Sequence, residues 1–95
     1  MAIMVETLVP VASRADADRL SDAIEASMVE RGGPPQGLMA HLASPLGDGF
    51  RICDVWATEA PMRAFYEEVV LPQLAAAGLA HEKSVVSPVW SFARP

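Results

Sequence analysis

The chain has few of the residues that mark disulfide, metal-binding or nucleic-acid-binding proteins. Its 95 residues include one cysteine and two histidines. A single cysteine cannot build an internal disulfide framework, and the two histidines lie too far apart to give metal-ligand spacing. Seven basic residues against twelve acidic ones give a formal net charge of −5. This sign disfavours nucleic acid and anionic membrane surfaces as partners.

Long apolar runs are also missing. No stretch approaches the roughly 20 apolar residues of a membrane span, and the N-terminus lacks the basic and apolar regions of a signal peptide. We therefore expect a cytoplasmic protein, which one unpaired cysteine also fits. The chain has no phosphate-cradling glycine loop and no G-x-S-x-G elbow. With 52% hydrophobic and 20% charged residues, it is nevertheless expected to fold, as one domain over residues 1–95.

The first half of the chain alternates between strand-like and helix-like patterns. Residues 2–11 are apolar and β-branched and predict a strand. Ser13 can cap a following helix, because its hydroxyl can accept a free N–H group of the first turn. Apolar residues then repeat at helical spacing until the Arg-Gly-Gly-Pro-Pro segment at 31–35, which ends the helix. Strands are predicted over 36–44 and 50–57, joined by a tight turn.

The second half predicts a helix and a last strand. Thr58 is expected to cap the helix, and Pro72 to kink or restart it, because proline lacks an N–H group. Gly78 is a typical C-terminal stop. The last strand is predicted over 85–93, where Pro88 suggests an edge or a bulge. The inward-facing helix positions are Met62, Phe65, Tyr66 and Val69.

The resulting order is β-α-β-β-α-β, which indicates an α+β, ferredoxin-like sandwich with a four-stranded antiparallel sheet and two helices on one face. If one face of the sheet were solvated, apolar and polar residues should alternate along each strand. The predicted strands lack this alternation, so neither face has the polar character of a solvated surface. Four short strands present about 300 Å² in projection, as much as the largest apolar patch of an ordinary monomer. We therefore predict a homodimer whose two sheets pack face to face.

This order, together with the run Gly49-Phe-Arg-Ile-Cys-Asp-Val-Trp leading into a capped helix, resembles the dimeric α+β barrel superfamily. Within the superfamily, the chain is most similar to the antibiotic-biosynthesis-monooxygenase-like group. The resemblance implies a dimer with a pocket between helices and sheet in each subunit. It also implies a small, often aromatic or polyketide-like ligand and chemistry without a metal or an organic cofactor.

The chain departs from the better-understood branches of the superfamily. In the haem-degrading branch, a strand tryptophan works with an asparagine on the first strand and a histidine on the second helix. Trp56 matches the tryptophan, but the first strand has Glu6 and Thr7 in place of the asparagine. The second helix has Phe65 and Tyr66 where the histidine is expected. Haem is therefore disfavoured as substrate. In the quinone-forming oxygenases the strand residue is polar, and Ile52 replaces it here, which weighs against oxygenase activity.

The predicted hairpin brings His41, Asp54 and Trp56 together as a candidate catalytic site. If Gly47-Asp48 is the turn, His41 lies directly across from Asp54; if the turn is Asp48-Gly49, His41 lies across from Trp56. Both registers put the three side chains on one face, because side chains alternate with period two. A histidine beside a carboxylate is a plausible general base or acid. The alternative interpretation is a polar pair that is satisfied within the core, with Trp56 as packing.

Further residues are candidates for substrate binding. Met39 lies on the same face of its strand as His41, and Ile52 lies on the same face of its strand as Asp54. Tyr66 either points its hydroxyl into the pocket or packs in the core. Trp90 lines either the pocket or the dimer seam.

Cys53 and His81 are weaker candidates. Cys53 points to the face opposite His41, so a structural thiol is favoured over a nucleophile. His81 lies in a charged loop and is expected to be solvated.

Three functions remain open at this stage. The first is a cofactor-free enzyme resembling monooxygenases, cyclases or isomerases, with His41 transferring a proton and Asp54 holding its tautomer. The second is a non-catalytic protein that binds a small hydrophobic or aromatic molecule. The third is a structural dimer. The fold supports all three.

Overall fold

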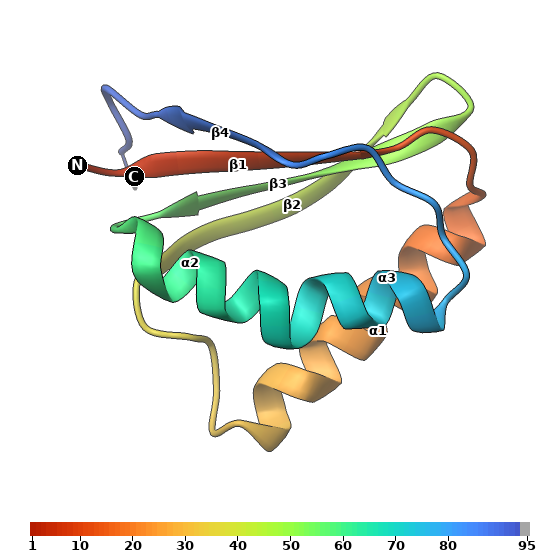
Figure 1. The fold of residues 1–95 in the computed structure, drawn as a ribbon, viewed down its shortest axis with the longest axis horizontal. Coiled ribbons are helices and arrows are strands. Elements are labelled where there is room, and N and C mark those ends of the chain that lie inside the picture. The colour runs from red at the N-terminus through yellow and green to blue at the C-terminus, as the bar shows by residue number, and fades with distance from the viewer. Residues whose placement is uncertain (94–95) are drawn as a thin grey trace.

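Residues 1–93 are described by the computed structural model and form a four-stranded sheet with helices on one face (Figure 1). The strand order is β2-β3-β1-β4, and all neighbouring strands are antiparallel. This confirms the predicted α+β class and element order. The elements are β1 (Ile3–Val9), α1 (Arg14–Glu30), β2 (Leu38–Leu46), β3 (Gly49–Trp56), α2 (Glu59–Phe65), the π-helical turn η1 (Tyr66–Val70), α3 (Leu71–Ala76) and β4 (Val85–Pro88).

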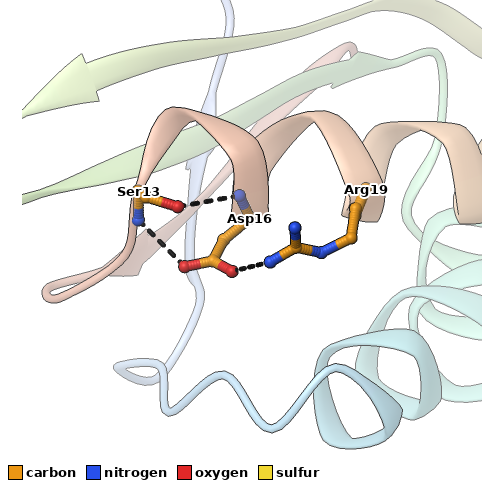
Figure 2. A network of polar contacts seen from close by, with 3 residues as sticks. All are labelled: Ser13, Asp16 and Arg19. Atoms are coloured by element: carbon orange, nitrogen blue, oxygen red, sulfur yellow. Dashed lines mark hydrogen bonds and ion pairs between the residues drawn. The ribbon is translucent and has the colours of Figure 1, made fainter.

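A capping box begins α1, as Figure 2 shows. The Ser13 hydroxyl accepts a hydrogen bond from the Asp16 backbone N–H at 3.1 Å, and the Asp16 carboxylate accepts one from the Ser13 N–H at 2.9 Å. Arg19 pairs with the other oxygen of Asp16. Two backbone donors that the helix leaves free are thereby satisfied. The predicted cap at Ser13 is confirmed.

The hairpin between β2 and β3 adopts the first of the two registers considered. Leu46 pairs with Gly49, so Gly47 and Asp48 form the turn, and Gly47 has φ +58°. Glycine is required at position 49 for another reason, because a Cβ there would lie 1.8 Å from the Val9 carbonyl oxygen. The close approach of β1 and β3 therefore depends on Gly49.

The second helical segment changes its winding in the middle. Pro72 has no N–H group and lies in the first turn of α3. The preceding N–H, of Leu71, bonds to the Tyr66 carbonyl five residues back, which is the π-helical pattern. The segment therefore restarts near Pro72, as predicted, and Gly78 (φ +69°) follows its end. Thr58 occupies the N-cap position of α2, as predicted, but its hydroxyl makes no capping hydrogen bond.

The outer strands are shorter than predicted. β1 ends at Val9, because Pro10 follows it and cannot donate to a ladder. β4 ends at Pro88, and the Val89 N–H beyond it donates to the Ala2 carbonyl at 2.9 Å. The predicted strand over 85–93 is therefore only four residues long. None of the helices in residues 1–93 is long and apolar enough to cross a membrane.

The two faces of the sheet differ in their cover. One face packs against the helices and carries the buried core, whereas no helix lies over the other face in Figure 1. We call this second surface the open face. Alternation and strand register place on it Met4, Glu6, Leu8, Leu42, Leu46, Arg51, Cys53, Val55 and Val85. Leu42 is 50% exposed and Val85 is 63% exposed, and Arg51 pairs with Glu6 at 3.5 Å.

Candidate functional site

The candidate site is built around a histidine–carboxylate pair on the helix side of the sheet. His41 of β2 lies directly across from Asp54 of β3. Its Nδ1 lies 2.5 Å from Asp54 Oδ1, and the carboxylate is fully buried. The bond to Asp54 raises the pKa of His41 above its ordinary value, although partial burial of the ring opposes the rise. The predicted juxtaposition of His41 and Asp54 is confirmed.

Tyr66 holds the second oxygen of the carboxylate. Its hydroxyl donates a hydrogen bond to Asp54 Oδ2 at 3.0 Å from the start of η1. Burial raises the pKa of Tyr66 far above its ordinary value, and the charge of Asp54 raises it further. The phenol therefore stays protonated and acts as a donor. Both Asp54 oxygens have a partner, which a buried carboxylate requires.

One nitrogen of His41 is left for other chemistry. A carboxylate at Nδ1 accepts a proton from it, which places the lone pair of the neutral ring on Nε2. The only hydrogen bond of the His41 ring to any part of residues 1–93 is the bond to Asp54, and the side chain is 27% exposed. His41 therefore combines a fixed tautomer, an increased basicity and a partly exposed side chain.

Trp56 lies two residues beyond Asp54 on the same side of β3, as predicted. It is fully buried and packs on Phe65, with ring centroids 5.7 Å apart and planes tilted by 48°. Its Nε1 is buried and makes no hydrogen bond within residues 1–93. An unpaired buried donor costs about 1–3 kcal/mol. In this state the ring forms no wall of an open pocket, so a stacking role for Trp56 remains a prediction.

The other predicted substrate residues fall into two places. Ile52 is buried beside the pair, between Thr7 of β1 and Ala43 of β2. Met39 lies at a β-bulge that interrupts the alternation on which its predicted placement depends. It lines a surface hollow of about 560 Å³ together with Trp90, which is 93% exposed. The structure therefore gathers Ile52, Tyr66 and Trp56 around Asp54 and leaves Met39 and Trp90 apart from them.

A half-open cavity of about 470 Å³ lies between α1 and the hairpin. Among the residues that line it are Arg14, Ala17, Ser21, Ala43, Pro45 and Phe50. Ala43 and His41 are successive side chains on the same side of β2, about 6.8 Å apart along the strand. The cavity thus adjoins the segment of β2 that carries His41, although His41 is not part of its lining.

Thr7 belongs to the site, although the sequence analysis treats it only as a departure from the haem-degrading pattern. Its side chain is fully buried on the helix side of β1, and its hydroxyl lies 2.6 Å from the hydroxyl of Ser84. A hydrogen bond from Thr7 lowers the pKa of Tyr66, against the larger effects that raise it. A polar residue between the inward-facing Val5 and Val9 was the signal in the sequence.

The remaining ionisable candidates lie outside this cluster. Cys53 is on the open face, where burial and then the charge of Glu6 raise the pKa of its thiol, so it is not activated as a nucleophile. His81 is exposed, and its Nδ1 lies 2.9 Å from the Glu82 carbonyl oxygen. Within residues 1–93, no group of three or more histidine, cysteine, aspartate or glutamate side chains could hold a metal ion.

Comparison with known proteins places the fold. No family model and no curated protein matches the chain. Among solved structures, the cofactor-independent oxygenase SnoaB of Streptomyces nogalater has a TM-score of 0.66 at 15% identity, covering 96% of this chain and 94% of that chain. A candidate antibiotic biosynthesis monooxygenase from Deinococcus radiodurans has a TM-score of 0.62 at 17% identity, covering 100% and 98%.

A third similar structure has no known function. The protein NE2512 from Nitrosomonas europaea has a TM-score of 0.61 at 21% identity, covering 99% of this chain and 93% of that chain. The chain therefore has the fold of the antibiotic-biosynthesis-monooxygenase-like proteins, which confirms the structural resemblance inferred from the run that ends at Trp56. At these identities the likeness concerns the fold.

Proposed function

We propose that this protein is a cofactor-free enzyme that transfers a proton on an aromatic or polyketide-like molecule, with His41 as the general base or acid. The observation that carries the proposal is the 2.5 Å contact between His41 Nδ1 and a buried carboxylate, with no further hydrogen bond from the His41 ring to residues 1–93. The cofactor-independent oxygenase SnoaB, which has a similar fold, supports this kind of chemistry.

The proposed step is a proton transfer. His41 Nε2 accepts a proton from an acidic C–H or O–H group of the substrate, whose electron pair stays behind as an enolate or phenolate. The positive imidazolium is then stabilised by Asp54, whose other oxygen is held by Tyr66. Return of the proton to another atom gives isomerisation or cyclisation. Oxygenation would instead require dioxygen as a second substrate.

The cavity between α1 and the hairpin is the proposed binding site. Its volume of about 470 Å³ lies within the roughly 300–1,000 Å³ usual for small-molecule sites. Alanine, proline and phenylalanine side chains supply apolar contact, and Arg14 and Ser21 supply polar groups at its helical side. This mixture suits a ring system that carries hydroxyl or keto groups.

Exchange of substrate protons for deuterium tests the proposal without knowledge of the final product. The probes are anthrone and a 1,3-diketone in D₂O, followed by NMR. We expect His41→Gln to reduce the enzyme-dependent exchange by at least about 100-fold, the usual contribution of a general base. His81→Gln is the matched control and should retain the full rate. Binding of a probe with no enzyme-dependent exchange would favour the non-catalytic binding protein instead.

We also propose that two copies pair through their open faces. Leu42, Leu46 and Val85 are all at least 46% exposed there, and a second copy would cover them. The Glu6–Arg51 pair lies among these apolar side chains and would fix the orientation of the two sheets, since buried charges need partners. This pairing leaves the helix side, and with it His41, free in each copy.

A further inference from the structure

The buried carboxylate of Asp54 is shared between two side chains from different elements. Asp54 Oδ1 lies 2.5 Å from His41 Nδ1 of β2, and Oδ2 accepts a hydrogen bond from the Tyr66 hydroxyl of η1 at 3.0 Å. On β1, the residue directly across from Asp54 is Val5, which is buried and has no polar side-chain atom. Because the neighbouring strand supplies no side-chain donor at this position, Tyr66 is the neutral donor that complements His41.

The single proton of the Tyr66 hydroxyl is directed at Asp54. The tyrosine is 5% exposed, and a phenol has only one proton to donate. Burial, and then the charge of Asp54, raise the pKa of Tyr66 far above its ordinary value, so this proton stays on the phenol. While the bond to Asp54 is intact, Tyr66 has no proton left for a bound molecule. Any effect of the hydroxyl on the site is therefore exerted through Asp54.

A donor at one carboxylate oxygen changes how strongly the other oxygen attracts a proton. The hydrogen bond from Tyr66 draws negative charge toward Oδ2, so Oδ1 stabilises a positive charge on His41 less. Protonated histidine has no lone pair with which to accept a further proton. A general base is most effective when its pKa lies near the working pH. Tyr66 therefore opposes the effect of Asp54 on His41, in the direction that suits a base.

We propose that Tyr66 is a positioning residue that limits the negative charge which Asp54 presents to His41, and thereby keeps more of His41 in the neutral form that can accept a proton. For its use in catalysis this inference rests on the proposed function, but the effect on the free protein does not. Phenylalanine would fill the same buried space and leave Oδ2 without its donor. Tyr66 is thus a partner of the base rather than of the substrate.

The other charged groups of the surrounding elements are paired or exposed. Asp54 is the charged group that acts on His41, and Cys53, on the open face, has only the smallest of the effects on Tyr66. Ion pairs join Arg14 with Asp18 on α1, Glu59 with Arg63 on α2, Glu68 of η1 with Arg31, and Glu6 with Arg51 on the open face. Asp22, Glu25 and Glu67 are exposed. A change at the Tyr66 hydroxyl therefore reaches His41 through Asp54.

The test is the NMR titration of the His41 imidazole without any substrate. Tyr66 is the only tyrosine of the chain, so growth on 3-fluorotyrosine alters this residue alone. Fluorine makes the phenol a stronger donor, whereas Tyr66→Phe removes the donor and keeps the ring. We expect Tyr66→Phe to raise the pKa of His41 by about half a unit, a fraction of the roughly one to two units that a hydrogen bond to a charged group is worth. The fluorinated protein should have a lower pKa at His41 than the wild type.

Two controls separate this effect from general damage to the fold. Val69→Ala removes buried apolar volume from the same π-helical turn, so it should lower stability and leave the titration of His41 unchanged. His81 is the second of the two histidines and is exposed, so its titration curve should be the same in every sample. The fluorinated protein keeps every other side chain, and it provides the result even if Tyr66→Phe does not fold.

The pH profile of the deuterium-exchange rate gives a second measurement. If Tyr66 acts on the base, Tyr66→Phe should move the low-pH limb of the profile to higher pH and approach the wild-type rate at the alkaline end. If Tyr66 instead donates its proton to the substrate, the rate should fall at every pH, which would contradict the inference.

The inference is overturned if folded Tyr66→Phe titrates at His41 like the wild type or at lower pH. It is also overturned if the fluorinated protein and Tyr66→Phe shift the pKa of His41 in the same direction, because donor strength would then be irrelevant. A wild type that shows no enzyme-dependent exchange would contradict the proposed function and leave these titrations unaffected, so the two failures can be told apart.

Discussion

At the scale of single residues, the site depends on one buried charge and its donors. Strand alternation was enough to predict that His41 and Asp54 share a face, because the hairpin joining them is only two residues long. The contribution of Thr7 was not predicted. Its partner Ser84 lies 77 positions away in the sequence, and local periodicity carries no information about such a contact. The bulge at Met39 was missed because one extra residue leaves little trace in an apolar strand.

The raised pKa of His41 predicts a pH-dependent stability. A histidine whose pKa is higher in the folded than in the unfolded state stabilises the fold when protonated. This contribution is fully present below the unfolded value of about 6.5 and is lost as the pH rises through the folded value. We expect the difference in unfolding free energy between wild type and His41→Gln to fall as the pH rises above about 6.5, by at most about 1.4 kcal/mol per pH unit.

Urea unfolding at several pH values measures this difference. Subtracting the His41→Gln curve removes the contributions of the ionisable groups that do not contact His41, because both proteins share them. A difference that stays constant or grows with pH would contradict a stabilising bond between protonated His41 and Asp54.

At the scale of elements, capping and turn residues explain where the helices begin and end. Ser13 and Thr58 looked alike in the sequence, since both are hydroxyl residues before a helical pattern. The structure separates them. Ser13 bonds to Asp16, which bonds back (Figure 2), whereas the side chain of Thr58 makes no capping hydrogen bond. The difference follows from position N3, where α1 has Asp16 and α2 has Pro61, which has no N–H to donate.

This contrast predicts unequal effects of two similar substitutions. Ser13→Ala should reduce the free energy of unfolding by about 0.5–2 kcal/mol, the usual cost of losing an N-cap. Thr58→Ala should change it by no more than about 0.5 kcal/mol, because no hydrogen bond is lost. Thermal and urea unfolding of both variants provide the measurement. Equal losses would show that the caps do not differ as described.

At the scale of the whole molecule, the sheet has a packed side and an uncovered side. The order β-α-β-β-α-β was sufficient to predict this arrangement, because both helices of such an order lie on one face. The lengths of β1 and β4 were overestimated, since apolar residues continue beyond Val9 and Pro88, where these strands end. Apolar character alone does not show where backbone pairing stops.

The uncovered side of the sheet predicts that the protein forms a homodimer. We expect the wild-type protein to have twice the 10.1 kDa of one chain in size-exclusion chromatography with light scattering. Leu42→Lys places a charge on the open face and should give a monomer. Val29→Lys is the matched control, because Val29 is exposed on α1, away from this face, and it should remain dimeric. A monomeric wild type at micromolar concentration would contradict the proposed pairing.

The most direct test of the central claim is the ¹⁵N NMR spectrum of the His41 ring. The account requires that Asp54 accept a proton from Nδ1, that Nε2 carry the lone pair of the neutral ring, and that the pKa of His41 exceed the ordinary value of about 6.5. We therefore predict a protonated Nδ1 and an unprotonated Nε2 at pH values above that pKa. A proton on Nε2 in the neutral ring, or a pKa below the ordinary value, would contradict His41 as a base held by Asp54.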